Sequence, residues 1–222
     1  MSYPVSFEAD YVERRSRLTT FFRLILAIPV AIVLYIYAIL AGFAILIAWF
    51  AIVITASYPQ ALYEFVAGFN RMQARVIAYT ALLCDDYPPF WGNPDPRYPV
   101  RMEFERLERY SRWKTLLRII LAIPILILRY AMGILLEIGA VAAWFLILIT
   151  GKMSEGLFDL MVLANSYTAR SDAYLYLLSE TYPPFQDEQT RTAGTPGPGP
   201  VPEPGVAPTP PAPGAPGAPG PG

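Results

Sequence analysis

Histidine is absent from the 222 residues, and cysteine occurs once, as Cys84. Without histidine the chain lacks the commonest general acid or base and the commonest metal ligand. One cysteine excludes an intrachain disulfide and a multi-thiolate metal site. The apolar runs hold no carboxylate pair, and the chain has no phosphate-binding loop. We therefore predict that the protein is not an enzyme, and has no catalytic residue, metal or cofactor.

Excess positive charge is also missing. The formal net charge is −1, so no global imbalance points to nucleic acid as a partner. Cys84 itself has two interpretations. It is either a small residue near the end of a helix or an acylation site close to a membrane.

Charge is entirely absent from residues 24–56. As one helix rising 1.5 Å per residue, this run would extend about 50 Å, well beyond a hydrocarbon core of about 30 Å. We therefore expect a hairpin of two short transmembrane helices, with its turn near Ala41 and Gly42. The matching later run carries Arg129 and Glu137 near its expected turn. Intramembrane charges are unfavourable, so they should reach the far interface, pair, or contact an ion or headgroup.

The sequence contains an internal repeat that covers most of the chain. At an offset of 95 residues, 3–90 (copy one) aligns with 98–185 (copy two) without a gap, giving 37 identities in 88 positions. Proline, tryptophan, asparagine and arginine all fall in register, which chance similarity between apolar segments would not produce. Residues 91–97 form a turn-rich linker. The pattern indicates duplication of one structural unit.

Each copy reads in the same order. Alternating apolar and polar residues at 3–10 and 98–105 predict a short strand, and the two strands are candidates to pair with each other. After the apolar run, apolar residues recur at helical spacing and predict an amphipathic helix, which lies either at the membrane interface or against the transmembrane hairpins. A Tyr-Pro-Pro-Phe sequence ends the helix in each copy.

Arginines recur in matching register before each apolar run and on each amphipathic helix. We single them out as candidates for contact with anionic lipid headgroups or a partner, the alternative being internal salt bridges. They are Arg17, Arg23, Arg75, Arg112, Arg118 and Arg170.

The segment 186–222 carries 12 of the 23 prolines and few large apolar residues, which predicts a disordered tail. It is either a solvated tether or a docking strip for a protein partner. With two spans per copy, every Lys and Arg except Arg129 lies on one side. The positive-inside rule makes that side the cytoplasm, so both termini are expected there.

The arginine spacing, Leu26–Pro29, the run ending at Trp49–Phe50 and the closing Tyr87–Phe90 resemble a bacterial membrane-protein family with tandem copies, catalogued as a domain of unknown function. The resemblance covers residues 3–185 and implies a bacterial cell membrane. It brings no activity, so no functional residue is carried over from it. The chain departs from the family pattern at one turn, where a Gly-Arg-Tyr-Pro-like sequence is expected. Residues 56–59 read Ala-Ser-Tyr-Pro there, and residues 151–154 read Gly-Lys-Met-Ser.

Together these observations predict an all-α, multi-pass membrane protein. It has two copies of a transmembrane hairpin plus an interfacial helix, each preceded by a short β-strand, at 1–90 and 98–185. The expected function is a non-enzymatic scaffold or accessory subunit that contacts the lipid bilayer and a protein partner. The alternative is a small transporter or channel subunit, since duplicated units with short, proline-containing helices occur in transporters.

Overall fold

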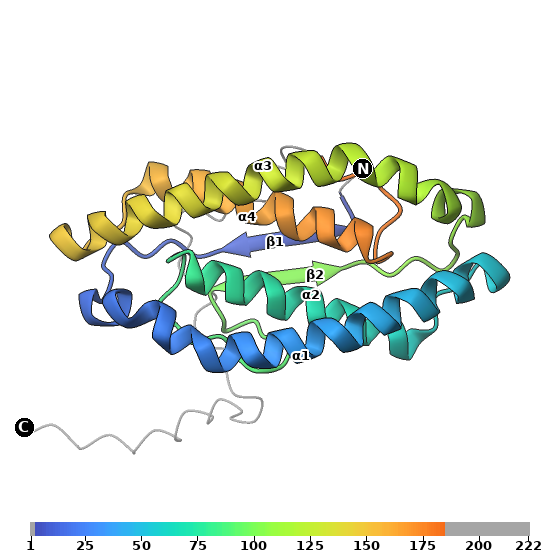
Figure 1. Ribbon diagram of the computed structural model, residues 1–222, viewed down its shortest axis with the longest axis horizontal. Helices are drawn as coiled ribbons and strands as arrows, with labels where there is room; N and C mark the ends of the chain where they lie inside the picture. Colours follow the sequence, from blue (N-terminus) through green and yellow to red (C-terminus); the bar gives the residue numbers. More distant parts are fainter. Residues whose placement is uncertain (1–2, 185–222) are drawn as a thin grey trace, which may run out of the picture.

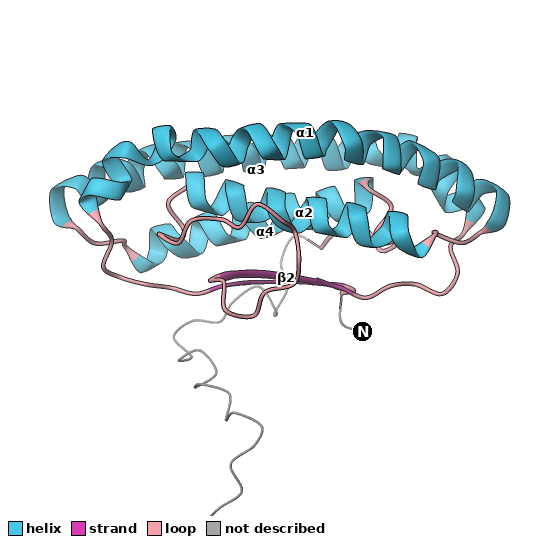
Figure 2. Ribbon diagram, turned by 90° about the horizontal axis from the view of Figure 1, so that it is seen from below, coloured by secondary structure: helices cyan, strands magenta, loops and turns pink. Residues whose placement is uncertain are grey.

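The computed structural model describes residues 3–184, which form three layers (Figure 2). Two long helices make one face, two shorter helices form the middle, and a two-stranded ribbon makes the other face (Figures 1 and 2). The predicted tail, 186–222, lies outside the described residues. The elements in chain order are β1 (Val5–Ala9), α1 (Arg17–Thr55), α2 (Gln60–Thr80), β2 (Val100–Phe104), α3 (Arg112–Thr150) and α4 (Glu155–Leu175).

Each apolar run is one continuous helix of 39 residues, so the predicted hairpins are wrong. The expected turn at Ala41 and Gly42 lies inside α1. The prediction assumed that the helix runs along the membrane normal, where bilayer thickness limits its length. Pro29 removes one backbone donor, but the helix continues on both sides of it. Small buried residues at 41, 44 and 48 instead provide a flat stripe for packing.

The two long helices are antiparallel. The N–H of Arg15, just before α1, donates to Gly151 O at the end of α3, at 3.0 Å. The N–H of Tyr110, just before α3, donates to Ala56 O at the end of α1, also at 3.0 Å. The basic segments that precede α1 and α3 therefore lie at opposite ends of the molecule (Figure 1).

The ribbon has the register that a two-fold axis requires. The predicted strands form and pair antiparallel, and Phe7 faces Met102, its own equivalent in copy two. Val5 and Ala9 face Phe104 and Val100, which are reciprocal equivalents. Because the central pair consists of repeat-related residues, a pseudo-two-fold axis passes between them, perpendicular to the ribbon. Each copy contributes one strand, and that strand has no pairing partner within its own copy. The ribbon therefore joins the two copies into one body.

The same axis crosses the middle layer. Asn70 Nδ2 donates to Ala169 O at 3.2 Å, and Asn165 Nδ2 donates to Ala74 O at 3.4 Å. These two bonds are repeat equivalents of each other, and both asparagines are buried. They tie α2 to α4 where the helices cross.

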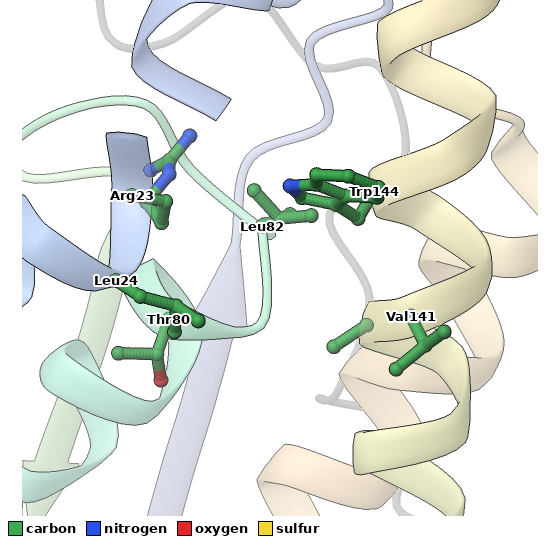
Figure 3. A pocket seen from close by; sticks show the side chains of 7 residues that line it. Arg23, Leu24, Thr80, Leu82, Val141 and Trp144 are labelled. Atoms are coloured by element: carbon green, nitrogen blue, oxygen red, sulfur yellow. The ribbon is translucent and has the colours of Figure 1, made fainter. Parts of the chain in front are cut away.

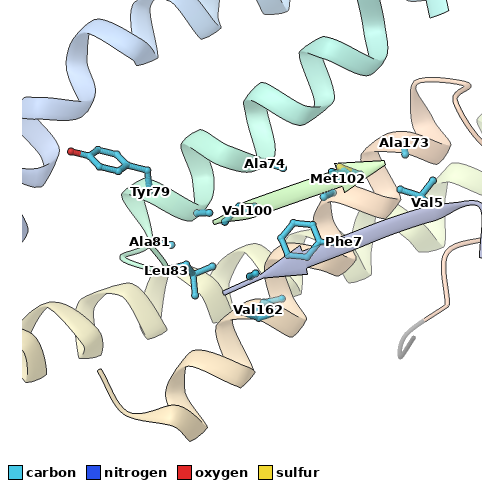
Figure 4. Packing of buried hydrophobic residues seen from close by; sticks show 14 of the residues in the cluster. Val5, Phe7, Ala74, Tyr79, Ala81, Leu83, Val100, Met102, Val162 and Ala173 are labelled. Atoms are coloured by element: carbon cyan, nitrogen blue, oxygen red, sulfur yellow. The ribbon is translucent and has the colours of Figure 1, made fainter. Parts of the chain in front are cut away.

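The core lies between the ribbon and the middle layer. Phe7 projects from β1 and Met102 from β2 toward small residues of the helices, including Ala74 and Ala173 (Figure 4). Both α2 and α4 are helices as predicted, but they are covered on both faces. Of the two expected positions, these helices therefore occupy the one against the long helices, and Arg75 and Arg170 are buried rather than exposed at a membrane interface.

Candidate functional site

An apolar layer covers one face of the molecule. Most exposed large hydrophobic side chains among residues 3–184, 32 of 39, belong to α1 or α3. Ile25, Ile36 and Ile47 are each more than half exposed, as are Ile120 and Ile127 of α3. Exposed apolar surface of this extent marks a face that meets a membrane or another apolar partner.

Both long helices are long and apolar enough to cross a membrane. Only 17% of the most apolar window of α1, and 22% of that of α3, is buried within the protein. The core helix of a water-soluble domain would be largely covered, and these helices are not.

Four of the six predicted arginine contacts are buried inside the protein. Arg23 donates to Cys84 O at 2.7 Å and pairs with Asp85. Arg118, its equivalent, donates to two backbone carbonyls, those of Tyr174 and Ser179. Each of the two guanidinium groups also lies 4.3 Å from the centre of a tyrosine ring. These arginines bind the end of a shorter helix to a long one.

Arg75 and Arg170 are likewise internal. Arg75 donates to the carbonyls of Val100 and Asn93, and so joins α2 to the ribbon and the linker. Arg170 bonds the hydroxyl of Ser166 within α4 at 2.9 Å. Like Arg23 and Arg118, both arginines make contacts inside the protein rather than presenting charge at the surface.

Arg17 and Arg112 are exposed at the starts of α1 and α3. Arg17 donates to Ile149 O, at the end of the antiparallel helix, at 3.1 Å. Lipid contact at these two positions stays a prediction. Because they stand at opposite ends of the molecule, any such contacts would be far apart.

A cavity, which we call the trough, opens between α3 and the two shorter helices and has a volume of about 640 Å³. Its α3 wall runs from Arg129 to Val141 and includes Glu137. Its floor is formed by Thr80 at the end of α2 and Thr168 on α4. The trough thus brings together both predicted intramembrane charges, which sequence spacing alone places eight residues apart.

An apolar side groove of about 250 Å³ adjoins the trough and shares Thr80, Ala140 and Val141 with it. Figure 3 shows Leu24 and Thr80 on one side of this groove, with Val141 and Trp144 on the other. The groove therefore runs between α1 and α3, from the polar floor toward the apolar layer.

Polar groups from three helices meet beneath the trough. Arg129 forms a two-bond ion pair with Asp172 of α4, through Nε and Nη2. Asp172 also accepts from Gln73 Nε2 of α2 at 3.1 Å, and Gln73 Oε1 accepts from the Tyr176 hydroxyl at 3.1 Å. Burial raises the pKa of the Asp172 carboxyl, while the hydrogen bond and charge of Arg129 oppose that shift. Of the alternatives that the sequence left open for Arg129, the structure shows pairing, with a partner that the sequence analysis missed.

Glu137 differs from Arg129. Its side chain is exposed, and within residues 3–184 it makes no hydrogen bond or ion pair. A single carboxylate without a partner in an apolar surround is unfavourable unless a ligand or solvent compensates it. Glu137 is therefore the charged group of the trough that no described residue balances.

A comparison of the copies would have revealed Asp172. Copy one has Leu34 and Ile77 where copy two has Arg129 and Asp172. Two apolar residues replaced together by opposite charges indicate a contact, even without other sequences. Thr80 and Thr168 carry no such signal, because hydroxyls on helices are common.

Cys84 is buried in the turn after α2, 3.3 Å from the Tyr98 hydroxyl. Burial raises the pKa of its thiol to about 11. An acylation site needs an accessible thiol, so the structure favours the simpler interpretation of Cys84 as a packed small residue.

Residues 3–184 contain no group of three or more Cys, Asp or Glu side chains placed to hold a metal ion. No curated protein and no solved structure matches the chain significantly. The family described as "Domain of unknown function (DUF4389)" matches twice, over residues 17–92 and 112–186. Each match begins at a long helix and includes the shorter helix that follows, so the family unit corresponds to one half of the pseudo-symmetric body without its strand. The chain belongs to this family and carries two tandem copies of its domain.

Proposed function

We propose that the protein is a non-enzymatic membrane scaffold whose long helices lie flat within one leaflet. The observation that supports this most directly is the segregation of its surface. The exposed face of α1 and α3 is apolar, and the opposite face is a polar ribbon (Figure 2). A protein with an apolar layer on one side alone is suited to embed that side and to leave the other in water.

The position of the ribbon argues against helices that stand along the membrane normal. The ribbon lies beneath the middle of the long helices (Figure 2), and carries an ion-pair cluster of Arg101 with Glu8 and Asp10. In a standing orientation this cluster would lie at the centre of the bilayer. Glu103 is exposed there as well. Charges at that depth and facing lipid are strongly unfavourable.

The flat orientation also resolves the distribution of basic residues. A standing pair of antiparallel helices would place the basic segments of the two copies on opposite sides of the membrane, against the positive-inside tendency. When the helices lie flat, both segments sit at the same interface. The pseudo-two-fold axis then runs along the membrane normal, and the charged ribbon faces the cytoplasm of a bacterial cell.

Depth measurements at Ile25, Ile36 and Ile47 test this orientation. These residues are spaced by 11 positions, so they share one face of α1, and they span about 33 Å along its axis. In a Cys84→Ser background, a spin label introduced at each position should report the same depth by oxygen and nickel accessibility. A label at Glu103 on the ribbon should report water.

A standing helix would give a different profile, with position 36 deep and positions 25 and 47 near opposite surfaces. An impermeant thiol reagent that reaches 25 and 47 from opposite sides of sealed vesicles would contradict the flat orientation.

The scaffold role rests on the same segregation, since the flat orientation leaves the ribbon free to meet a soluble partner. We include the segment 186–222 in this proposal as a docking strip for a protein partner. Purification in mild detergent with and without that segment should separate partners of the ribbon from partners of the tail. Solute flux through reconstituted liposomes above that of empty liposomes would contradict the scaffold role and favour the transport alternative.

A further inference from the structure

The threonines of the trough offer only acceptors to a ligand. Thr80 Oγ1 donates its hydrogen to the carbonyls of Val76 and Ile77, each at 3.0 Å. Thr168 Oγ1 donates to Ala164 O at 2.9 Å. A hydroxyl has one hydrogen, so only lone pairs remain on both oxygens. An anionic ligand would find no donor in either of them.

The charge in the trough has the same preference. Arg129 is balanced by Asp172, which leaves the carboxylate of Glu137 as the unbalanced charge. Helix α2 ends at Thr80 on the floor, and the C-terminal end of a helix carries partial negative charge. The group that complements a carboxylate, two hydroxyl acceptors and a helix C-terminus is an ammonium with three donors.

One cationic group in the trough retains free donors. Arg129 uses Nε and Nη2 on Asp172, and its Nη1 makes no hydrogen bond within the described part of the chain. Its side chain is 31% exposed. A guanidinium with a free edge is suited to a phosphate oxygen.

We propose that the trough binds the headgroup of one ethanolamine-type phospholipid. Its ammonium lies at Glu137 and the threonine oxygens, its phosphate at Arg129, and an acyl chain follows the side groove past Trp144 toward the apolar layer. This inference rests on the proposed function, because a lipid of the embedded leaflet has its headgroup toward the ribbon side and its chains toward the bilayer centre. That is the direction in which the trough and the groove run.

The test uses the full chain, purified in detergent, with dioleoyl phosphatidylethanolamine, phosphatidylcholine or phosphatidylglycerol added separately, and native mass spectrometry as the readout. Phosphatidylethanolamine should be retained at one molecule per chain. Phosphatidylcholine lacks ammonium N–H donors and phosphatidylglycerol lacks the cation, so both should be retained at least tenfold less.

Glu137→Gln, which removes the charge at constant size, should lower retention of phosphatidylethanolamine at least tenfold. The matched control is Glu103→Gln, the same change on the exposed ribbon, which should leave retention unchanged. Equal retention of the three lipids, or no effect of Glu137→Gln, would overturn the proposal. Displacement of the lipid by millimolar O-phosphoethanolamine would assign the site to a free amine phosphate rather than to a lipid, and would overturn it as well.

The two proposals fail separately. A V-shaped depth profile along α1 would refute the flat orientation whatever lipid is retained. A flat profile with no selectivity for the ethanolamine headgroup would leave the scaffold intact and refute the lipid site.

Discussion

Copy one and copy two share a backbone but not a chemistry. Arg23 and Arg118 occupy equivalent places, each 4.3 Å from the centre of its tyrosine ring, Tyr79 or Tyr174. The charged residues of the trough, in contrast, all come from copy two. Arg129 and Glu137 in its wall, and Asp172 beneath it, replace Leu34, Gly42 and Ile77 of copy one. The framework is thus the same in both copies, while copy two alone carries charged groups at these positions.

The largest effect on stability should come from replacing the ion pair of copy two, Arg129 and Asp172, with the leucine and isoleucine of copy one. Arg129→Leu alone leaves the carboxylate of Asp172 buried without its countercharge, and should lower the free energy of unfolding by about 3–5 kcal/mol. Asp172→Ile alone should cost less, because the exposed part of Arg129 can reach water. The double variant should fall within about 1 kcal/mol of the wild type, because an apolar pair of similar volume replaces an ion pair. Denaturant titration in mixed micelles measures all three. A double variant as unstable as Arg129→Leu would show that the pair stabilises the fold in a way that leucine and isoleucine do not.

A smaller difference should separate the carboxylates that cap the long helices. Asp85 accepts from the Ser16 N–H and pairs with buried Arg23. Glu180 accepts from the Ser111 N–H, but its ion pair is a long one of 3.9 Å to exposed Lys114. Asp85→Asn should therefore lower the free energy of unfolding by about 1.5–3 kcal/mol, and Glu180→Gln by about 1 kcal/mol. Equal losses in thermal denaturation would mean that helix capping, rather than the ion pair, dominates at both positions.

Alkaline pH should affect copy one through Cys84, whose equivalent is Ser179. The thiol pKa is about 11 in the folded protein and about 9 when unfolded, because burial disfavours the thiolate. The unfolded state therefore loses its proton first, and stability falls as pH rises from about 9 to 11. At pH 10 the loss from this group is about 1.4 kcal/mol, and Cys84→Ser should abolish it.

The measurement is the difference in unfolding free energy between wild type and Cys84→Ser at pH 8 and at pH 10. Subtraction removes the contributions of lysine and of the tyrosines that do not contact Cys84. Tyr98 does contact it, but burial, which the two proteins share, is the main reason that its pKa is raised. A difference that does not change with pH would show that the thiolate is as well accommodated in the folded state as in water.

The smallest effect should appear where the long helices end. Both C-caps are left-handed, with φ of 57° at Ala56 and 74° at Gly151. Glycine adopts this conformation without steric strain, so Ala56→Gly should raise the free energy of unfolding by about 0.5–1 kcal/mol. Gly151→Ala should lower it by about 1 kcal/mol, since the added Cβ would lie 3.2 Å from Arg17 Nε. The same sign of change at both sites would contradict this account of the caps.

The sequence predicted the elements well and their arrangement poorly. Alternation at 3–10 and helical spacing at 60–83 correctly predicted β1 and α2, because these patterns depend on which faces of a segment are covered. The division of 24–56 into two helices was wrong, because it was derived from an assumed orientation in the bilayer. Arg75 was placed on an exposed face because its helix has a polar side, and only the ribbon that covers this side shows otherwise.

Some residues of the candidate site could be predicted from the sequence, and others could not. Arg129 and Glu137 could be singled out because they are charges in an apolar run. Asp172 lies in an amphipathic helix, where a charged residue is ordinary, so the sequence of that helix does not single it out. The register between copies contained the missing information. A charge that is unusual for its segment can be found from composition, while its partner requires knowledge of which segments touch.

The sequence by itself determined the duplication, the six elements apart from the undivided long helices, and the apolar character of one layer, because each depends on local pattern or on self-comparison. The tertiary structure alone decided that α1 and α3 run antiparallel, that the axis passes between Phe7 and Met102, and that the arginines bind carbonyls inside the protein. These features depend on contacts between segments some 95 residues apart. Hydrophobic periodicity records which face of a segment is buried, but not which other segment buries it.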